Sequence, residues 1–412
     1  MTPTVTYRSK ILVVSSQRLI HDGYITVELG ISEKHPVPTI RDVGPWSNYS
    51  GNRSHVVDLG QQAICPALIN AHTHLEFSNL NSPITSPDGT FAGWIREVVG
   101  MRFRKAKELD SSALQADRRK AIENGQLESE KAGVVALGDI VTQPQVNTAT
   151  GLYKVEFLEM LGLRRDRAEQ SFLWATEVLE RLPQPNQALS PHAPYSTSTW
   201  LYRQAADYAR RHQLPLATHL AETREEQELL QHRSGPLVEL FRELGVWEPE
   251  EIQTHSFQQM IQLLANNQDV LLVHGNYLSP TDWKAIPKSA NWTVVYCPQT
   301  HKHFGHEPHP WPEMLRDGIN VALGTDSRAS SNCLDLWQDF QIACHSRPEI
   351  HPQQLLPLVT ENAARALKLD HRWGSLEAGK NAAILTIPLI GPTENTQQFW
   401  EQLPECLPTT AN

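Results

Sequence analysis

The sequence predicts an α/β protein whose main part is a (β/α)8 barrel of the TIM type, with a second, small β domain. Three observations lead to this prediction: eight short apolar runs, amphipathic segments between the runs, and differently patterned segments at both ends. Continuous apolar runs separated by helical segments are typical of buried parallel strands. The runs lie near residues 64–71, 133–140, 154–161, 187–191, 214–219, 269–274, 292–297 and 319–325.

The segments between the runs carry the end signals of helices. Residues 198–212 follow Ser196 and Thr197, either of which is a suitable N-cap. Residues 223–232 begin with the acids of TREEQ, which the helix dipole favours in a first turn. The proline after Gly235 then interrupts this helix.

Both ends of the chain differ from its middle. Alternating segments such as KILVVSS and GYITVEL lie before residue 60, and residues 374–388 read as a turn followed by a strand. We therefore expect a small β domain, formed by residues 1–63 and by residues 373–412 with their tail, around a barrel of residues 64–372. The length of 412 residues suits this division, because such a barrel takes roughly 250 residues.

Composition limits the expected partners and location. The formal net charge of -10 repels polyanions, so neither nucleic acid nor an anionic membrane is expected as a partner. Five dispersed cysteines without paired spacing indicate a reducing compartment. No apolar stretch approaches the roughly 20 residues that span a bilayer, and the apolar run near the N-terminus is too short for a signal peptide. We expect a soluble, cytoplasmic protein.

Metal-binding residue types end four of the predicted strands, and barrel enzymes place their active sites at such ends. His72 and His74 end the first run, and residues two apart in a strand point to the same side. The fifth, sixth and eighth runs end in His219, His274 and Asp326. Each feature also has an ordinary explanation by itself. His72 and His74 could be a pair of surface histidines, His274 a hydrogen-bonded core or loop residue, and Asp326 the cap of the next helix. Together, the four strand ends predict one metal site.

The ligand set also predicts the chemistry. Three imidazoles and one carboxylate suit Zn²⁺ or Fe²⁺ better than Mg²⁺ or Ca²⁺. A metal with an open position lowers the pKa of bound water toward roughly 7 and yields hydroxide. Glu222, three residues after His219, is then placed to move protons, and His274 to orient the hydroxide. These residues predict a metal-dependent hydrolase.

At this point the chain resembles the amidohydrolase superfamily, on the segments PALINAHTHLEFSNL, THLAE, VHG and GTDS. The resemblance spans roughly residues 10–388. It implies a distorted barrel with a small β-sandwich formed by both termini. It also implies His72, His74, His219 and Asp326 as the metal ligands. Glu222 would protonate a ring nitrogen, His274 would assist the attacking water, and Asp326 would accept a proton from that water.

Two features narrow the resemblance. The fourth run ends in SPHAPY and lacks the lysine that binuclear members have there, so one metal ion is expected. The spacing of His219 and Glu222 is typical of members that hydrolyse C–N bonds of aromatic heterocycles. NAHTHLEFSNL, GTFAGWI, FLEMLGL and HAPYS resemble the aminofutalosine deaminase branch most. The expected activity is removal of the 6-amino group of an adenine nucleoside, with aminodeoxyfutalosine of menaquinone biosynthesis as favoured substrate. Family habit suggests a homodimer.

Other readings stay open. The alternatives are deamination of S-adenosylhomocysteine, methylthioadenosine or guanine, chlorotriazine hydrolysis, and a non-catalytic, metal-stabilised scaffold. A loop with four histidines follows strand seven, and a second metal site there competes with substrate contact by His301. The other candidate substrate contacts are Glu76, Phe77, Trp94 and His192, and Arg96, Arg164 or Arg165 would suit a substrate carboxylate.

Overall fold

The computed structural model describes residues 3–30, 37–143, 151–181, 186–391 and 393–410. The chain forms two compact units, and each is assembled from separated stretches of sequence. Met1–Ala71, Glu128–Ala136 and Asp335–Asn412 make up the first unit, and His72–Leu127 and Leu137–Leu334 make up the second.

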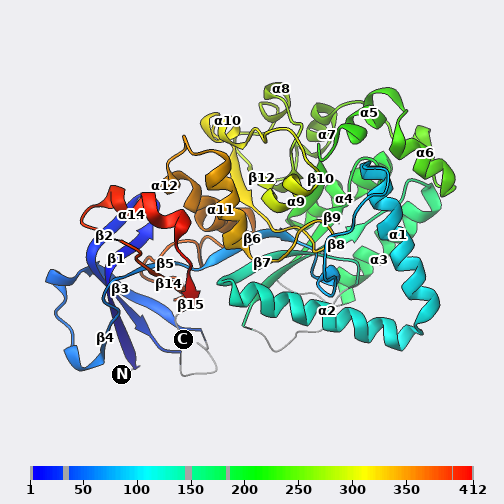
Figure 1. Ribbon diagram of the computed structural model, residues 1–412. Helices are drawn as coiled ribbons and strands as arrows, with labels where there is room; N and C mark the ends of the chain where they lie inside the picture. Colours follow the sequence, from blue (N-terminus) through cyan, green and yellow to red (C-terminus); the bar gives the residue numbers. More distant parts are fainter. Residues whose placement is uncertain (1–2, 31–36, 144–150, 182–185, 392, 411–412) are drawn as a thin grey trace. The chain divides into compact units, whose positions relative to one another are not determined.

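An eight-stranded sheet of parallel strands forms the barrel, with the strands adjacent in chain order (Figure 1). A bridge between Thr73 and Asp326 joins the first strand to the end of the last, so the sheet nearly closes. The strands are β6 (Leu68–Thr73), β7 (Val134–Val141), β8 (Tyr153–Met160), β9 (Gln187–Pro191), β10 (Leu216–Leu220), β11 (Asp269–His274), β12 (Asn291–Tyr296) and β13 (Asn320–Leu323).

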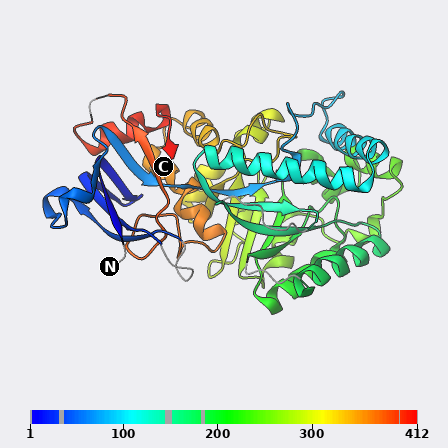
Figure 2. The ribbon, with the colours of Figure 1, turned by 90° about the horizontal axis from the view of Figure 1, so that it is seen from below.

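Helices occupy the connections between these strands from β6 to β7 and from β8 to β13; part of the connection from β7 to β8 lies outside the described residues. For example, α3 and α4 lie side by side and pack on the outside of β8 and β9 (Figure 2). The helices up to β13 are α1 (Phe91–Glu108), α2 (Ser111–Lys131), α3 (Arg165–Arg181), α4 (Thr199–His212), α5 (Arg224–His232), α6 (Pro236–Glu243), α7 (Phe257–Leu264), α8 (Pro280–Trp283), α9 (Pro298–His303) and α10 (Trp311–Arg316), with short 3-10 turns η3 (Leu75–Phe77) and η4 (Pro249–Glu251). After β13 come α11 (Leu336–Ser346), α12 (Pro352–Leu355), η5 (Leu356–Val359), α13 (Glu361–Ala366), α14 (Thr396–Gln402) and η6 (Leu403–Glu405).

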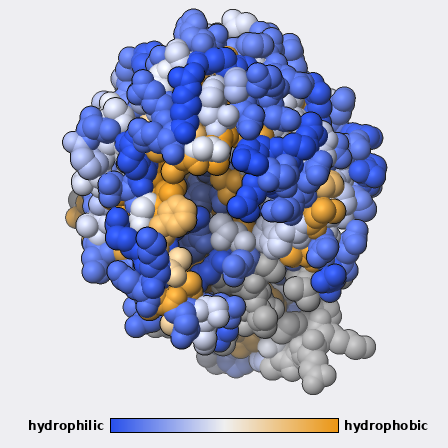
Figure 3. Space-filling view, turned by 90° about the vertical axis from the view of Figure 1, so that its right-hand side faces the viewer, coloured by the Kyte–Doolittle hydropathy of each residue, from blue (hydrophilic) through white to orange (hydrophobic). Residues whose placement is uncertain are grey.

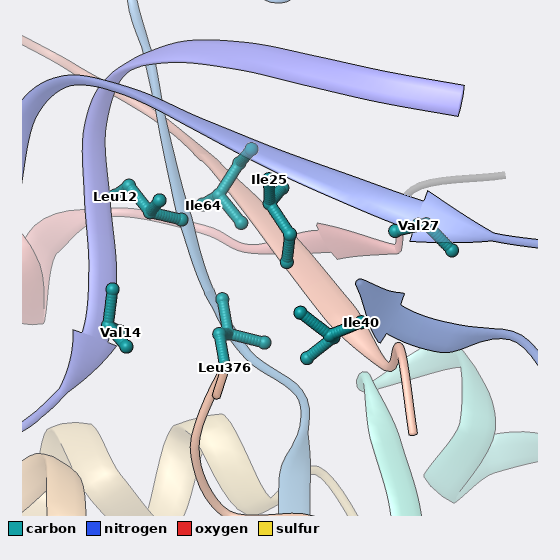
Figure 4. Close-up of a cluster of buried hydrophobic side chains, with 7 residues drawn as sticks. All are labelled: Leu12, Val14, Ile25, Val27, Ile40, Ile64 and Leu376. Carbon is teal, nitrogen blue, oxygen red and sulfur yellow. The ribbon is translucent and has the colours of Figure 1, made fainter. Parts of the chain in front are cut away.

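The first unit contains a second sheet, which both ends of the chain build. Its order is β15-β14-β5-β1-β2-β3, with β4 paired to β1. Seven fully or nearly fully buried aliphatic side chains form its core (Figure 4): Leu12, Val14, Ile25, Val27, Ile40, Ile64 and Leu376. Its elements are β1 (Thr4–Ser15), β2 (Arg18–Glu28), β3 (Thr39–Pro45), β4 (Val56–Asp58), β5 (Gln62–Pro66), β14 (Ile384–Pro388) and β15 (Thr409–Thr410), with η1 (Trp46–Asn48) and η2 (Arg53–His55).

The predicted fold class is confirmed, with two local differences. The predicted run 64–71 divides at Ala67, because β5 belongs to the two-ended sheet and β6 is the first barrel strand. The predicted caps of α4 are wrong. Ser198 accepts the bond from the amide of Leu201, since the hydroxyls of Ser196 and Thr197 bond elsewhere.

Candidate active site

Two strand ends meet at the predicted metal site. The amide of Asp326 donates to the carbonyl oxygen of His72 over 3.1 Å, and Thr73 Oγ1 donates to the carbonyl oxygen of Asp326 over 2.8 Å. Gly324 permits this approach, because a Cβ at that position would lie 2.8 Å from the His72 carbonyl oxygen. β6 and β13 thereby hold His72 and Asp326 side by side.

The four predicted ligands lie close together. The three histidines His72, His74 and His219 each offer one nitrogen, and these nitrogens all lie within 4.8 Å of one another. Nε2 of His74 is 3.3 Å from Nε2 of His219. Oδ1 of Asp326 is 3.6 Å from Nε2 of His72 and 3.7 Å from Nε2 of His74. Three nitrogens and one carboxylate oxygen converging in this way fit a single divalent cation.

Hydrogen bonds orient two of these ligands. Nδ1 of His219 lies 3.0 Å from the carbonyl oxygen of His192. A carbonyl only accepts, so Nδ1 carries the proton and Nε2 turns a lone pair toward the cluster. The hydroxyl of Ser330 donates to Oδ2 of Asp326 over 3.1 Å, which leaves Oδ1 facing the imidazoles.

The ionisation states also suit a metal. Burial lowers the pKa of His72, His74, His219 and His274, so these imidazoles are neutral and their nitrogens can coordinate. Burial alone would raise the pKa of Asp326, but the imidazoles around it outweigh this effect and lower the pKa. The donor set therefore consists of neutral nitrogens and an ionised carboxylate.

Glu222 lies beside this cluster, in surroundings that favour its protonated form. Its Oε1 is 3.3 Å from Nε2 of His274, and the hydroxyl of Tyr195 donates to its Oε2 over 3.1 Å. Burial, and then the charges of Asp326 and Glu226, raise the pKa of Glu222 well above its ordinary value. The pKa values of these two nearby carboxyl groups are shifted in opposite directions, Glu222 upward and Asp326 downward, as is common for an acid and a base that act together.

Three residues at these strand ends adopt left-handed backbone conformations without being glycine. The φ angles are 56° for Ala221, 71° for His274 and 56° for Asp326. Such backbone costs of order 1–3 kcal/mol per residue and gathers at functional sites. His309 helps to hold one of them: its Nε2 donates to the carbonyl oxygen of His274 over 2.7 Å, while its Nδ1 accepts from the amide of Trp311.

A cavity of about 330 Å³ is lined by His74 and His219 of the cluster together with Glu222, His274 and Asp326. Its polar end is formed by the strand-end residues described above. Its remaining wall is mostly apolar and comes from α1, the segment after β8, and the region of α6: Ile95, Val98, Leu161, Phe241, Leu244 and Val246. A hollow bordered by hydrophobic residues is visible on the face shown in Figure 3.

The predicted substrate contacts divide into two groups. Phe77, Trp94 and His192 line the cavity. Glu76 is absent from its lining and instead pairs with Arg102 and Arg118 and accepts from the hydroxyl of a threonine at the end of β7. Its contact with substrate stays a prediction.

The histidines after strand seven bond to different partners. His301 Nδ1 is 3.1 Å from Oδ1 of Asn276, and His306 Nδ1 is 3.0 Å from the hydroxyl of Tyr277. Nε2 of His303 donates to a backbone carbonyl 3.1 Å away. Across the described ranges, the one group of three or more side chains close enough to share an ion is the cluster on β6 and β10.

The candidate arginines are also separated. Arg96 pairs with Glu243 at 2.8 Å, and Arg165 pairs with a glutamate of η4. Neither lines the cavity, whereas Arg164 does, together with Arg167, which was not predicted. Arg164 and Arg165 are neighbours in the sequence, and only the structure shows that the first lines the cavity and the second does not.

Sequence reasoning missed several residues of the site. Glu159 lies in the buried strand β8 and lines the cavity, with Oε1 3.9 Å from Nε2 of His192. Burial raises its pKa to about 7. A glutamate near the end of a buried strand, with no lysine or arginine next to it in the sequence, was a usable signal. Tyr195 and Asn276, which contact Glu222, had no such signal.

Comparison with known proteins identifies the family. The model of the amidohydrolase family matches residues 63–405. The chain belongs to this family. It is therefore an enzyme of the hydrolase class that acts on carbon–nitrogen bonds, as predicted.

Curated relatives include two kinds of deaminase. The 5-methylthioadenosine/S-adenosylhomocysteine deaminase of Pyrococcus furiosus is 27% identical over 94% of this chain and 85% of the relative. The aminodeoxyfutalosine deaminase of Deinococcus radiodurans is 29% identical over 74% of this chain and 73% of the relative.

Solved structures share the fold. Helicobacter pylori aminofutalosine deaminase in complex with methylthio-coformycin has a TM-score of 0.78 at 22% identity, covering 97% of this chain and 96% of that one. An atrazine chlorohydrolase from Arthrobacter aurescens, complexed with zinc, has a TM-score of 0.72 at 18% identity over 96% and 90% of the two chains. Among the residues that the structure describes, no helix has the length and apolar character needed to cross a membrane.

Proposed function

We propose that this enzyme deaminates adenosine-like nucleosides by hydrolysis at the 6-position of the purine. The observation that carries the proposal is that Glu222 and Asp326 line one cavity beside the imidazole cluster, with the pKa of Glu222 raised and that of Asp326 lowered. Hydrolysis of an aromatic amine needs a proton donor for the ring and a proton acceptor for the water, and the two carboxyl groups supply both. The names of the two relatives agree with this reaction class.

The proton balance can be followed through these two groups. Glu222 donates its proton to N1 of the purine, which makes C6 electrophilic. Water forms a bond to C6, and Asp326, assisted by His274, takes one of its protons. That proton passes to the amino group, the C6–N6 bond breaks and ammonia leaves. The hydroxyl proton on C6 returns to Glu222, and the 6-oxo purine keeps the proton on N1.

The residues that would hold the metal are His72, His74, His219 and Asp326. When bound, a divalent ion supplies Lewis-acid activation of the attacking water. We propose Zn²⁺, which the nitrogen-rich donor set favours. Zinc is also named for the Arthrobacter aurescens neighbour.

The cavity wall away from the metal cluster suggests what the substrate carries on its ribose. Arg164 and Arg167 lie there with the apolar side chains of Leu161 and Leu244. An apolar wall next to guanidinium groups suits a ribose substituent with an aromatic ring and a carboxylate. We therefore propose aminodeoxyfutalosine, an adenine nucleoside with a carboxyphenyl group, as the favoured substrate. S-Adenosylhomocysteine, which has a carboxylate without the ring, is the second candidate.

Contacts with the purine are proposed from the same cavity. Phe77 and Trp94 have aromatic faces on which a purine can stack, and His192 lies between the metal cluster and Glu159. We also propose a cytoplasmic location, which the five free cysteines support. A homodimer remains the proposed assembly.

The test is ammonia release by the zinc-loaded protein from a panel of substrates. The panel contains aminodeoxyfutalosine, S-adenosylhomocysteine, methylthioadenosine, adenosine, guanine and a chlorotriazine, the last assayed by chloride release. Preference for aminodeoxyfutalosine supports the full proposal. Equal turnover of several adenine nucleosides supports the deaminase activity but rejects aminodeoxyfutalosine as the favoured substrate. No turnover of any nucleoside, with metal bound, rejects the proposed function.

A further inference from the structure

The turn after β10 carries two neighbouring glutamates whose carboxylates contact different parts of the site. Helix α5 begins there, and its N-cap is Thr223, whose hydroxyl accepts from the amide of Glu226. Acids in a first turn are usually explained by the helix dipole. Glu225 and Glu226 go further, since each accepts hydrogen bonds from backbone amides that lie outside α5.

Glu226 holds the backbone of the proton donor. Its side chain is fully buried, and its carboxyl oxygens accept from the amide of Ala221 over 3.2 Å and from the amide of Glu222 over 2.7 Å. The carbonyl oxygen of Glu222 is held from the other side, because Nδ2 of Asn276 donates to it over 2.9 Å. Ala221 has left-handed backbone, so these bonds stabilise a conformation that the local sequence disfavours.

Glu225 holds the helix that forms a wall of the cavity. Its carboxylate accepts from the amides of Phe91 and Ala92 over 2.7 and 2.9 Å. These are the first two residues of α1, where unpaired amides and the helix dipole favour an anion. Trp94 and Val98, on the following turns of α1, line the cavity. The carboxylate therefore fixes where this wall begins.

We propose that the two glutamates divide the positioning of the active site, so that Glu226 governs turnover through Glu222 and Glu225 governs substrate affinity through α1. Neither side chain lines the cavity, so both are positioning residues. The inference deepens the proposed function and rests on it for its kinetic part.

The test compares three matched variants: Glu226→Gln, Glu225→Gln and, as a control on the same helix, Glu228→Gln. Glutamine keeps the shape and one acceptor but places an NH₂ group against a backbone amide. The side chain of Glu228 instead accepts from the hydroxyl of Ser234, away from the cavity. The measurements are kcat and KM on the best nucleoside of the panel, with zinc content and melting temperature checked for every variant.

The expected results differ in kind. Glu226→Gln lowers kcat roughly 10- to 100-fold with KM within about twofold, because a displaced proton donor slows chemistry. Glu225→Gln raises KM roughly three- to tenfold with kcat within about twofold, since it weakens the bonds that hold the wall. Glu228→Gln changes neither. If Glu225→Gln and Glu226→Gln show the same pattern, or both match the control, the division of roles is wrong.

Hydrogen exchange gives a readout that needs no activity. Glu226→Gln should speed exchange only in the peptide around Ala221 and Glu222. Glu225→Gln should speed exchange only in the peptide around Phe91 and Ala92. Faster exchange at both places in either variant would overturn the proposal. Should Glu226→Gln fail to fold, Asn276→Ala removes the opposite support of Glu222 and must lower kcat in the same way. A wild type that is inactive on every nucleoside rejects the proposed function, and the exchange pattern then decides between separate and shared positioning.

Discussion

The two ends of the cavity differ in the elements that build them. The inner end consists of side chains at strand ends, nearly all buried and held by hydrogen bonds to the backbone or to one another. The outer end comes from helices and from the segment after β8, and its Leu161 and Leu244 are 41% and 42% exposed. Strand ends in a barrel are fixed by the sheet, whereas the segments beyond them tolerate change. We therefore expect the chemistry at the inner end and the choice of substrate at the outer end.

The largest effect should come from removing a ligand at the inner end. His72→Ala takes away one of the clustered nitrogens, so we expect loss of bound metal and turnover below detection. Metal content by mass spectrometry and ammonia release are the measurements. His303→Ala is the matched control, because His303 bonds to a backbone carbonyl outside the cluster. Full metal occupancy in His72→Ala would disprove the ligand set.

Glu222→Gln tests the role of the acid independently of metal binding. The variant keeps the side-chain volume but no longer has an acid proton to donate, so we expect turnover to fall roughly 10²- to 10⁴-fold while the metal stays bound. Single-turnover kinetics and metal analysis check both parts. Unchanged turnover would remove Glu222 from the mechanism, and loss of metal would show that the site depends on this side chain for its structure.

Arg164→Ala addresses the outer end. Loss of one guanidinium should lower kcat/KM roughly tenfold for nucleosides with a carboxylate and leave methylthioadenosine unaffected. Arg165→Ala is the control, since its side chain lies outside the cavity and pairs with Glu251. An equal loss on all nucleosides would mean that the two ends of the cavity are not independent.

Glu159→Gln should give the smallest effect on turnover, because we expect this change to act on the pH dependence of stability. Burial raises the pKa of Glu159 from 4.5 to about 7, so between these values the folded state holds a proton that the unfolded state has lost. The carboxyl group therefore costs the wild type stability as pH rises from about 4.5 through about 7, by about 1–3 kcal/mol. Urea unfolding at pH 5 and pH 8 should show that this loss is smaller in Glu159→Gln. An identical pH dependence in both proteins would contradict the raised pKa.

Much of the inner end could be predicted from the sequence. His72 and His74 follow an apolar run at a spacing that places them on one side of a strand, and His219, His274 and Asp326 end later runs. Both signals are local, and a barrel brings the ends of its strands together whatever the lengths of the connections. The predicted fold class and the predicted clustering of these side chains both depend on this rule, and the structure shows both; the roles of ligand and acid stay predictions.

The outer end needed the tertiary structure. Arg164 and Arg165 are neighbours with the same charge, yet only Arg164 lines the cavity. Glu225 and Glu226 are likewise adjacent, and their carboxylates bind amides of different segments. The direction of a side chain on a helix or loop depends on the elements packed against it, which local sequence does not record. The pattern of apolar runs and the residues at their ends therefore determined the barrel and the gathering of His72, His74, His219 and Asp326, whereas long-range packing decided which side chains line the cavity and which hold the backbone of Glu222.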